Sequence, residues 1–178
     1  IKFGYNSQLL KSTSQYLAAN NVINRLASWK KSCGDEHCRY TGQSATKLPS
    51  IEFKTTTSAE NLRVGYRNTY TFSRNETRYN SVNAASKSTL NFPSLLDGSA
   101  FRIKHLNVGW GAVVNLAAGD YWIEKLKLGS DVKINIVGEG TVRLFVQNDV
   151  VFPWNSRINW EGNNSSDTSK LLIYGHNK

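Results

Sequence analysis

A pattern of eleven residues recurs along this chain, and the repeat constrains the fold more than any other feature. Leu126 to Ile136 reads as an alternating apolar segment, a turn at Gly129 and a second alternating segment. The pattern begins at Ile1, Leu62, Val82, Leu106, Leu126 and Val150, so the last five copies start at alternating steps of 20 and 24 along the sequence. One copy cannot bury its own apolar face, whereas stacked copies build a continuous core.

The aligned copies indicate which positions face the core. The first, third and ninth positions are apolar at the period of two that is typical of half-buried strands. These positions hold, in order, Ile1, Leu62, Val82, Leu106, Leu126 and Val150; then Phe3, Val64, Ala84, Val108, Leu128 and Phe152; then Leu9, Tyr70, Leu90, Val114, Ile134 and Ile158. The fourth position is Gly, Ala or Pro, which favours a turn. We therefore predict an all-β parallel β-helix, or β-solenoid, in which each step of the repeat forms one coil.

Asparagine occupies the tenth position in four consecutive copies, at Asn91, Asn115, Asn135 and Asn159. This position falls between two inward positions, so the side chains should point outward. Amides stacked in register form hydrogen-bonded ladders along the stacking axis. A structural ladder explains the coincidence with the repeat better than a ligand site does.

The domain organisation is inferred from the parts of the sequence in which the repeat is regular. Residues 1–178 are interpreted as a single domain in which 62–175 form regular coils and 1–11 form a first coil. Short apolar segments such as Tyr121 to Ile123 are expected to add another strand to each coil. The irregular stretch 12–56 is interpreted as an insertion or cap over one side or end of the solenoid, because open strand edges invite pairing. Its segment Ala18 to Lys31 has apolar residues near helical spacing, which is compatible with a short helix.

Composition narrows the context of the chain. The sequence lacks methionine and begins directly with a strand, so we expect a segment of a longer protein. No run of 18 apolar residues occurs, so no membrane insertion is expected. The net charge of +9 favours acidic partners, but the Lys and Arg residues are scattered over outward positions, as on an ordinary solvated face. No basic-aromatic module is present, so specific nucleic-acid binding is not expected.

Two cysteines, Cys33 and Cys38, are separated by four residues. This spacing suits a small disulfide loop. A metal site would need two ligands beyond these cysteines; His37 is close by, but the sequence has no second cysteine pair, so we expect no metal and no cofactor. A disulfide indicates an oxidising compartment.

Aromatic residues recur at the fifth position of every second coil, as Tyr66, Trp110 and Trp154, at equal steps along the sequence. Aromatic faces beside polar groups can stack on sugar rings. With Arg63 and Asn107 from the second position, these residues form our candidate glycan-binding face. The alternative is that the rings fill a corner of the core.

A polysaccharide lyase or hydrolase is the competing function, because β-helices often host such enzymes. An enzyme of this kind would need paired carboxylates, or acidic metal ligands and a base. The chain has only 13 acidic residues. Asp97 and Asp120 lie at expected turns, where Asx turns explain them. Glu124 and a lone His105 complete no recognisable catalytic set. We therefore predict no enzyme and no catalytic residue.

Several segments taken together resemble a known family. They are Ala118 to Trp122, Leu126 to Ser130, Gly140 to Val146 and Ser169 to Gly175. Their order is similar to that in the N-terminal region of the MshQ family, large proteins encoded with the mannose-sensitive haemagglutinin (MSHA) type IV pilus. The resemblance implies an extracellular, pilus-associated protein of the cell surface that contributes to attachment, with pilus components or cell-surface glycan as partners. It supplies no catalytic residue.

Overall fold

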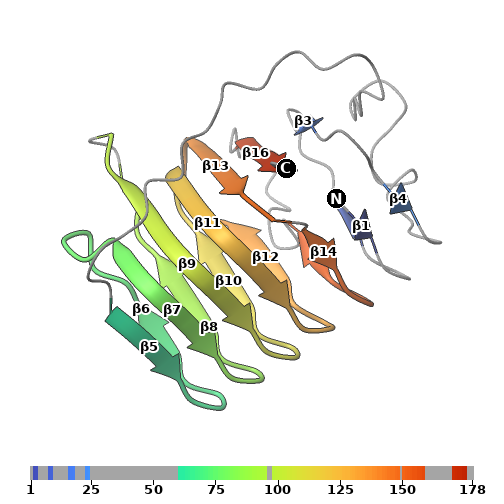
Figure 1. Ribbon diagram of the computed structural model, residues 1–178, viewed down its shortest axis with the longest axis horizontal. Coiled ribbons are helices and arrows are strands. Elements are labelled where there is room, and N and C mark those ends of the chain that lie inside the picture. The colour runs from blue at the N-terminus through green and yellow to red at the C-terminus, as the bar shows by residue number, and fades with distance from the viewer. Residues whose placement is uncertain are drawn as a thin grey trace.

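The computed structural model describes residues 60–158 except 96, 97 and 149, the strand at 170–175, and four short strands between Lys2 and Asn24. In this part of the chain all regular elements are β-strands, and every strand pairing is parallel. Successive coils stack side by side from β5 (Glu60–Val64) toward β16 (Lys170–Gly175), as Figure 1 shows. The predicted all-β solenoid is confirmed.

Each of the first four coils consists of a long strand, a turn and a shorter strand. The long strand and the shorter strand that follows it in each coil are β5 and β6 (Thr69–Thr71), β7 (Arg78–Ala84) and β8 (Thr89–Phe92), β9 (Ala100–Val108) and β10 (Val113–Leu116), and β11 (Gly119–Leu128) and β12 (Lys133–Ile136). The long strands belong to a seven-stranded sheet and the short ones to a six-stranded sheet. The apolar segment Tyr121 to Ile123, expected to form a separate strand, runs on into β11 without a break.

The fifth coil departs from this two-sheet plan. Its long strand is interrupted, so that β13 (Thr141–Val146) stays in the seven-stranded sheet while β14 (Val151–Phe152) joins a separate three-stranded sheet. β15 (Arg157–Ile158) then continues the six-stranded sheet. Among the described residues, a third side to the coil therefore exists only at this end of the solenoid.

The core lies between the sheets and follows the predicted columns. Val108, Leu128 and Ile134 are 4%, 8% and 5% exposed, so the inward assignment of the first, third and ninth positions is confirmed. Only Leu62 and Tyr70, both in the coil at 62, are partly buried among the described members of these columns. An end coil has a neighbour on one side only, which accounts for their exposure.

Close stacking of coils requires glycine at two turns. A Cβ at Gly109 would lie 2.7 Å from the backbone nitrogen of Ser86, and a Cβ at Gly129 would lie 2.7 Å from that of Trp110. Real Cβ atoms do not approach backbone so closely. The glycines of the fourth position therefore let neighbouring turns touch through their backbones.

Residues 1–11, interpreted as a first coil, lie at the end of the solenoid opposite to the copy at 62. β1 (Lys2–Phe3) pairs with β14 and β2 (Gln8–Leu9) pairs with β15, while β16 pairs with β13. The N-terminal copy thus completes the coil that β16 begins, at the end opposite to β5. Its apolar pattern matches that of every other coil.

The start of the 12–56 insertion extends this same end. β3 (Tyr16–Ala18) pairs with β16, and β4 (Ile23–Asn24) pairs with β1. The helix considered for 18–31 therefore does not run through residues 23 and 24, which are extended. The rest of that segment, with Cys33 and Cys38, lies outside the described residues, so the disulfide stays a prediction.

Candidate functional site

The turns after the long strands stack into a continuous edge, which we call the turn edge. In four of the five described turns the residue at the seventh position donates its N–H to the carbonyl at the fourth, as from Asn68 to Gly65 at 3.1 Å and from Ser88 to Ala85 at 3.3 Å. The sixth position has φ near +60°, the value of a type II turn's third residue. The residues in this conformation are Arg67, Lys87, Gly111, Asp131 and Asn155. Backbone bonds such as Lys87 N–H to Trp110 O, at 2.8 Å, join one turn to the next.

The three predicted aromatic residues project from the turn edge. Tyr66, Trp110 and Trp154 are 55%, 48% and 50% exposed, so the alternative that they fill a corner of the core is wrong. They belong to alternate coils, and coils stack at about 4.8 Å, which places neighbouring rings roughly 10 Å apart along the axis. At this separation the aromatic rings do not stack on one another.

Charged neighbours hold the rings in place. The Lys87 ammonium lies 4.8 Å from the ring centroid of Trp110, and the Arg67 guanidinium lies 5.1 Å from that of Tyr66. Such cation–π contacts contribute about 0.5–1 kcal/mol at exposed sites. The indole N–H of Trp110 also donates to Asp131 at 2.6 Å, and the Asn155 amide donates to the same carboxylate. The Trp110 ring is therefore oriented before any ligand arrives.

A groove runs along the axis beside the turn edge, across four coils. It is lined by the second, third and fourth positions, namely Arg63, Val64, Gly65, Asn83, Ala84, Ala85, Asn107, Val108, Gly109, Lys127, Leu128 and Gly129. The structure thus brings the predicted Arg63 and Asn107 into one surface. Tyr66 and Trp110 do not line the groove, but each follows a groove residue directly in the chain, whereas Trp154 belongs to the next coil.

Two asparagine ladders stabilise the stack. In the predicted ladder Asn135 donates to Asn115 at 3.0 Å and Asn115 donates to Asn91 at 2.7 Å. The ladder is therefore confirmed in the described coils, while Asn159 lies outside them. A second ladder, which the alignment did not single out, has Asn107 donating to Asn83 at 2.8 Å within the groove. Both keep neighbouring coils in register.

Sequence reasoning also missed an aromatic ladder on the outward face of the seven-stranded sheet. Trp122 and Phe145 stack at a centroid distance of 4.2 Å, and Phe145 and Tyr174 stack at 4.8 Å, with nearly parallel rings. These rings occupy successive coils, so each covers a face of its neighbour. The stacking therefore covers part of each ring face on this sheet.

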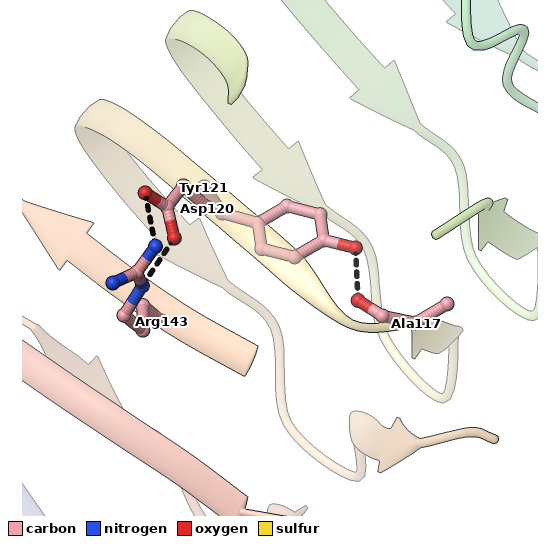
Figure 2. A network of polar contacts seen from close by, with 4 residues as sticks. All are labelled: Ala117, Asp120, Tyr121 and Arg143. Carbon is pink, nitrogen blue, oxygen red and sulfur yellow. Dashed lines mark hydrogen bonds and ion pairs between the residues drawn. The ribbon is translucent and has the colours of Figure 1, made fainter. Parts of the chain in front are cut away.

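Of the acidic residues considered for catalysis, Asp120 is engaged in an ion pair. Asp120 accepts two hydrogen bonds from Arg143 on the next coil, while Tyr121 points inward and donates to the Ala117 carbonyl at 2.6 Å (Figure 2). Burial raises the pKa of the Tyr121 hydroxyl, so this tyrosine stays neutral and serves the core. Asp97 lies outside the described residues.

One carboxyl pair exists in the coil at 62, between Glu60 and Glu76. The Glu60 carboxyl hydrogen-bonds to Glu76, and this contact, with some desolvation, raises the Glu76 pKa above its ordinary value. Within the described residues no three His, Cys, Asp or Glu side chains gather as a metal site would require.

Comparison with known proteins identifies no relative. No protein-family model matches the chain, and neither a curated protein nor a solved structure matches it significantly. Among the described residues there is also no helix of the length and apolarity needed to cross a membrane. Function must therefore be argued from the surface itself.

Proposed function

We propose that this protein is a structural and adhesive module of the cell surface that holds an extended glycan along the turn edge. The observation that carries the proposal is that Tyr66, Trp110 and Trp154, which share one column of the repeat, are all exposed to solvent. A solenoid supports this role because its coils repeat at a fixed spacing and present a long, straight surface.

The chemistry of the edge favours carbohydrate. Exposed aromatic rings provide apolar faces for sugar rings, and the neighbouring amides of Asn83 and Asn107 supply hydrogen bonds for hydroxyl groups. The rings recur at roughly 10 Å, a span comparable to two sugar units of an extended chain. A polymer can therefore contact several rings at once, and linked weak contacts give a strong total attachment.

The cellular setting in this proposal rests on the resemblance to the MshQ family. An extracellular, pilus-associated location would bring the turn edge into contact with surface polysaccharides, and pilus components are the expected protein partners. A rigid solenoid in such a protein also serves as a spacer between its neighbours.

A glycan array on the purified protein, with and without Ca²⁺, tests the proposal. We expect retention of at least one polysaccharide by the wild type and at least a tenfold loss in Trp110→Ala, which should still fold because its ring is half exposed. Trp122→Ala is the matched control, because it removes a tryptophan from the sheet face instead of the turn edge. Absence of any glycan retention, or equal retention by Trp110→Ala and the wild type, contradicts the proposal.

A further inference from the structure

The groove beside the turn edge has cationic side chains at both ends. Arg63 lines its first coil and Lys127 its fourth, and both side chains are exposed. In the described part of the chain neither has a carboxylate partner, and none of the groove's described lining residues is acidic. The positive charge here is therefore not neutralised by the described residues, in contrast to Arg143, which binds Asp120.

Four of the lining residues, those at the fourth position of the repeat, have small side chains, and we call them the floor of the groove. They are Gly65, Ala85, Gly109 and Gly129, none of which has more than a methyl side chain. The N–H groups at three of these positions donate to the preceding coil, with Gly109 bonded to Ala84 O at 2.8 Å. Polar groups of a ligand must therefore be met by the second-position side chains, while its apolar faces can lie on the floor.

The second-position side chains form an ordered series along the axis: Arg63, Asn83, Asn107 and Lys127. Because coils stack at about 4.8 Å, the two cationic residues lie about 14 Å apart along the axis. The Asn107 amide group donates to Asn83, which leaves the Asn107 carbonyl oxygen without a donor among the described residues. The series thus offers a cation, two amides and a cation to a chain lying in the groove.

We propose that the groove selects acidic polysaccharides, with uronate carboxylates at Arg63 and Lys127 and sugar hydroxyls at Asn107. This inference rests on the proposed glycan-binding function and adds the class of glycan. Charge-assisted hydrogen bonds to carboxylate are about twice as strong as neutral ones, so acidic polymers gain affinity over neutral ones of the same backbone.

The spacing of the cations favours a polysaccharide over nucleic acid. Two cations about 14 Å apart match a polymer whose charges are widely spaced. Duplex DNA carries one charge per about 1.7 Å and attracts proteins through many phosphate contacts at once. Oligo-dT, a single-stranded DNA, is the competing ligand in the test.

The experiment measures binding of the wild type to polygalacturonate, alginate and hyaluronan, and to each after chemical reduction of its carboxyl groups. We expect at least one acidic polymer to bind at least tenfold more tightly than its reduced form. The double variant Arg63→Gln with Lys127→Gln should lose that difference while binding the reduced form like the wild type. Trp110→Ala should lose both.

A charge-matched control separates the groove from net charge. Arg78→Gln with Lys104→Gln removes the same two charges from exposed positions that do not line the groove, and should bind like the wild type. An equal loss in this control, or equal binding of acidic and reduced polymers, overturns the acidic-groove inference and leaves the glycan-binding function standing. Failure of the wild type to bind any polymer overturns both, as does groove-dependent binding of oligo-dT alone.

Discussion

The indole N–H of Trp110 donates a 2.6 Å hydrogen bond to the carboxylate of Asp131, which lies in the next coil of the turn edge. Asp131 itself has φ near +59°, and its carboxylate also accepts a hydrogen bond from Asn155. Asp131 therefore links three successive coils and sets the direction in which the Trp110 ring faces solvent.

Replacing Asp131 with Ala should release the Trp110 ring and weaken glycan binding. The loss of a hydrogen bond to a carboxylate at a part-exposed site, with the strain of alanine at positive φ, should lower the free energy of unfolding by about 1–2 kcal/mol. Asp131→Asn is the control, because its amide oxygen still accepts from the indole and asparagine tolerates this backbone conformation. Urea unfolding followed by tryptophan fluorescence measures the stability of the two variants, and glycan retention measures their binding. Equal effects of the two variants would contradict the linking role.

Much of the architecture could be predicted from the sequence, because each copy of the repeat shows by its own alternation which side chains face the core. The first, third and ninth columns recur with the pleat of the strands, so residues such as Leu128 and Ile134 could be assigned to the core without knowing the number of sheets. The turns and the Asn91–Asn115–Asn135 ladder followed from the same alignment.

What the repeat could not predict depends on the segments between its copies. Trp122, Phe145 and Tyr174 stack in space, yet they follow one another at unequal steps along the sequence, because the connections between coils differ in length. These steps do not match those of the repeat, so an alignment of its copies does not place the three rings in one column.

The exposure of the turn-edge rings was also beyond the pattern alone. Alternation assigns the faces of strands, but Trp110 lies in a turn, where the period of two ends. Only the geometry of the turn, with its positive φ at the next residue, decides that the ring points to solvent.

Replacing Leu128 with Asp should unfold the protein. Leu128 is 8% exposed in the core of the fourth coil, and an unpaired buried carboxylate costs several kcal/mol, comparable to the whole stability of a small domain. Leu128→Met is the control, because a volume-conserving change should cost less than about 1.5 kcal/mol. Circular dichroism at room temperature distinguishes the two; a folded Leu128→Asp protein would contradict the inward assignment.

Replacing Gly129 with Ala should destabilise the stack of turns. The new Cβ would lie 2.7 Å from the Trp110 backbone nitrogen, so the coils must separate locally, at a cost of about 1–3 kcal/mol. In Gly65→Ala the new Cβ meets the flexible Asn68 amide at 3.0 Å, so we expect a smaller loss. Thermal unfolding of the two variants tests this order, and a reversed order would refute the backbone-contact explanation.

Stability should depend on pH through Glu76. Its hydrogen bond with Glu60 raises the Glu76 pKa in the folded state, so the folded protein holds this proton more tightly than the unfolded chain does. The resulting stabilisation is fully present below the ordinary pKa of 4.5 and is lost as the pH rises through the raised pKa. In Glu76→Gln the amide keeps a hydrogen bond without titrating.

Melting temperatures of the wild type and Glu76→Gln, measured from about pH 4 to pH 7, isolate this contribution from that of the other carboxyls. We expect the wild type to lose stability relative to the variant as the pH rises from the lower limit. Parallel curves across the whole range would show that Glu76 titrates alike in the folded and unfolded states.

Deleting residues 1–11 should weaken the end of the solenoid that lies farthest from β5. β1 and β2 pair with β14 and β15, which contain the buried residues Phe152 and Ile158, so their removal leaves two strand edges of the fifth coil unpaired. Unpaired edges of this kind accept a matching strand. A synthetic peptide of residues 1–11 should therefore bind the truncated protein and raise its melting temperature, whereas a scrambled peptide should not. If the truncated protein melts like the wild type and ignores the peptide, the N-terminal copy does not complete the coil that β16 begins.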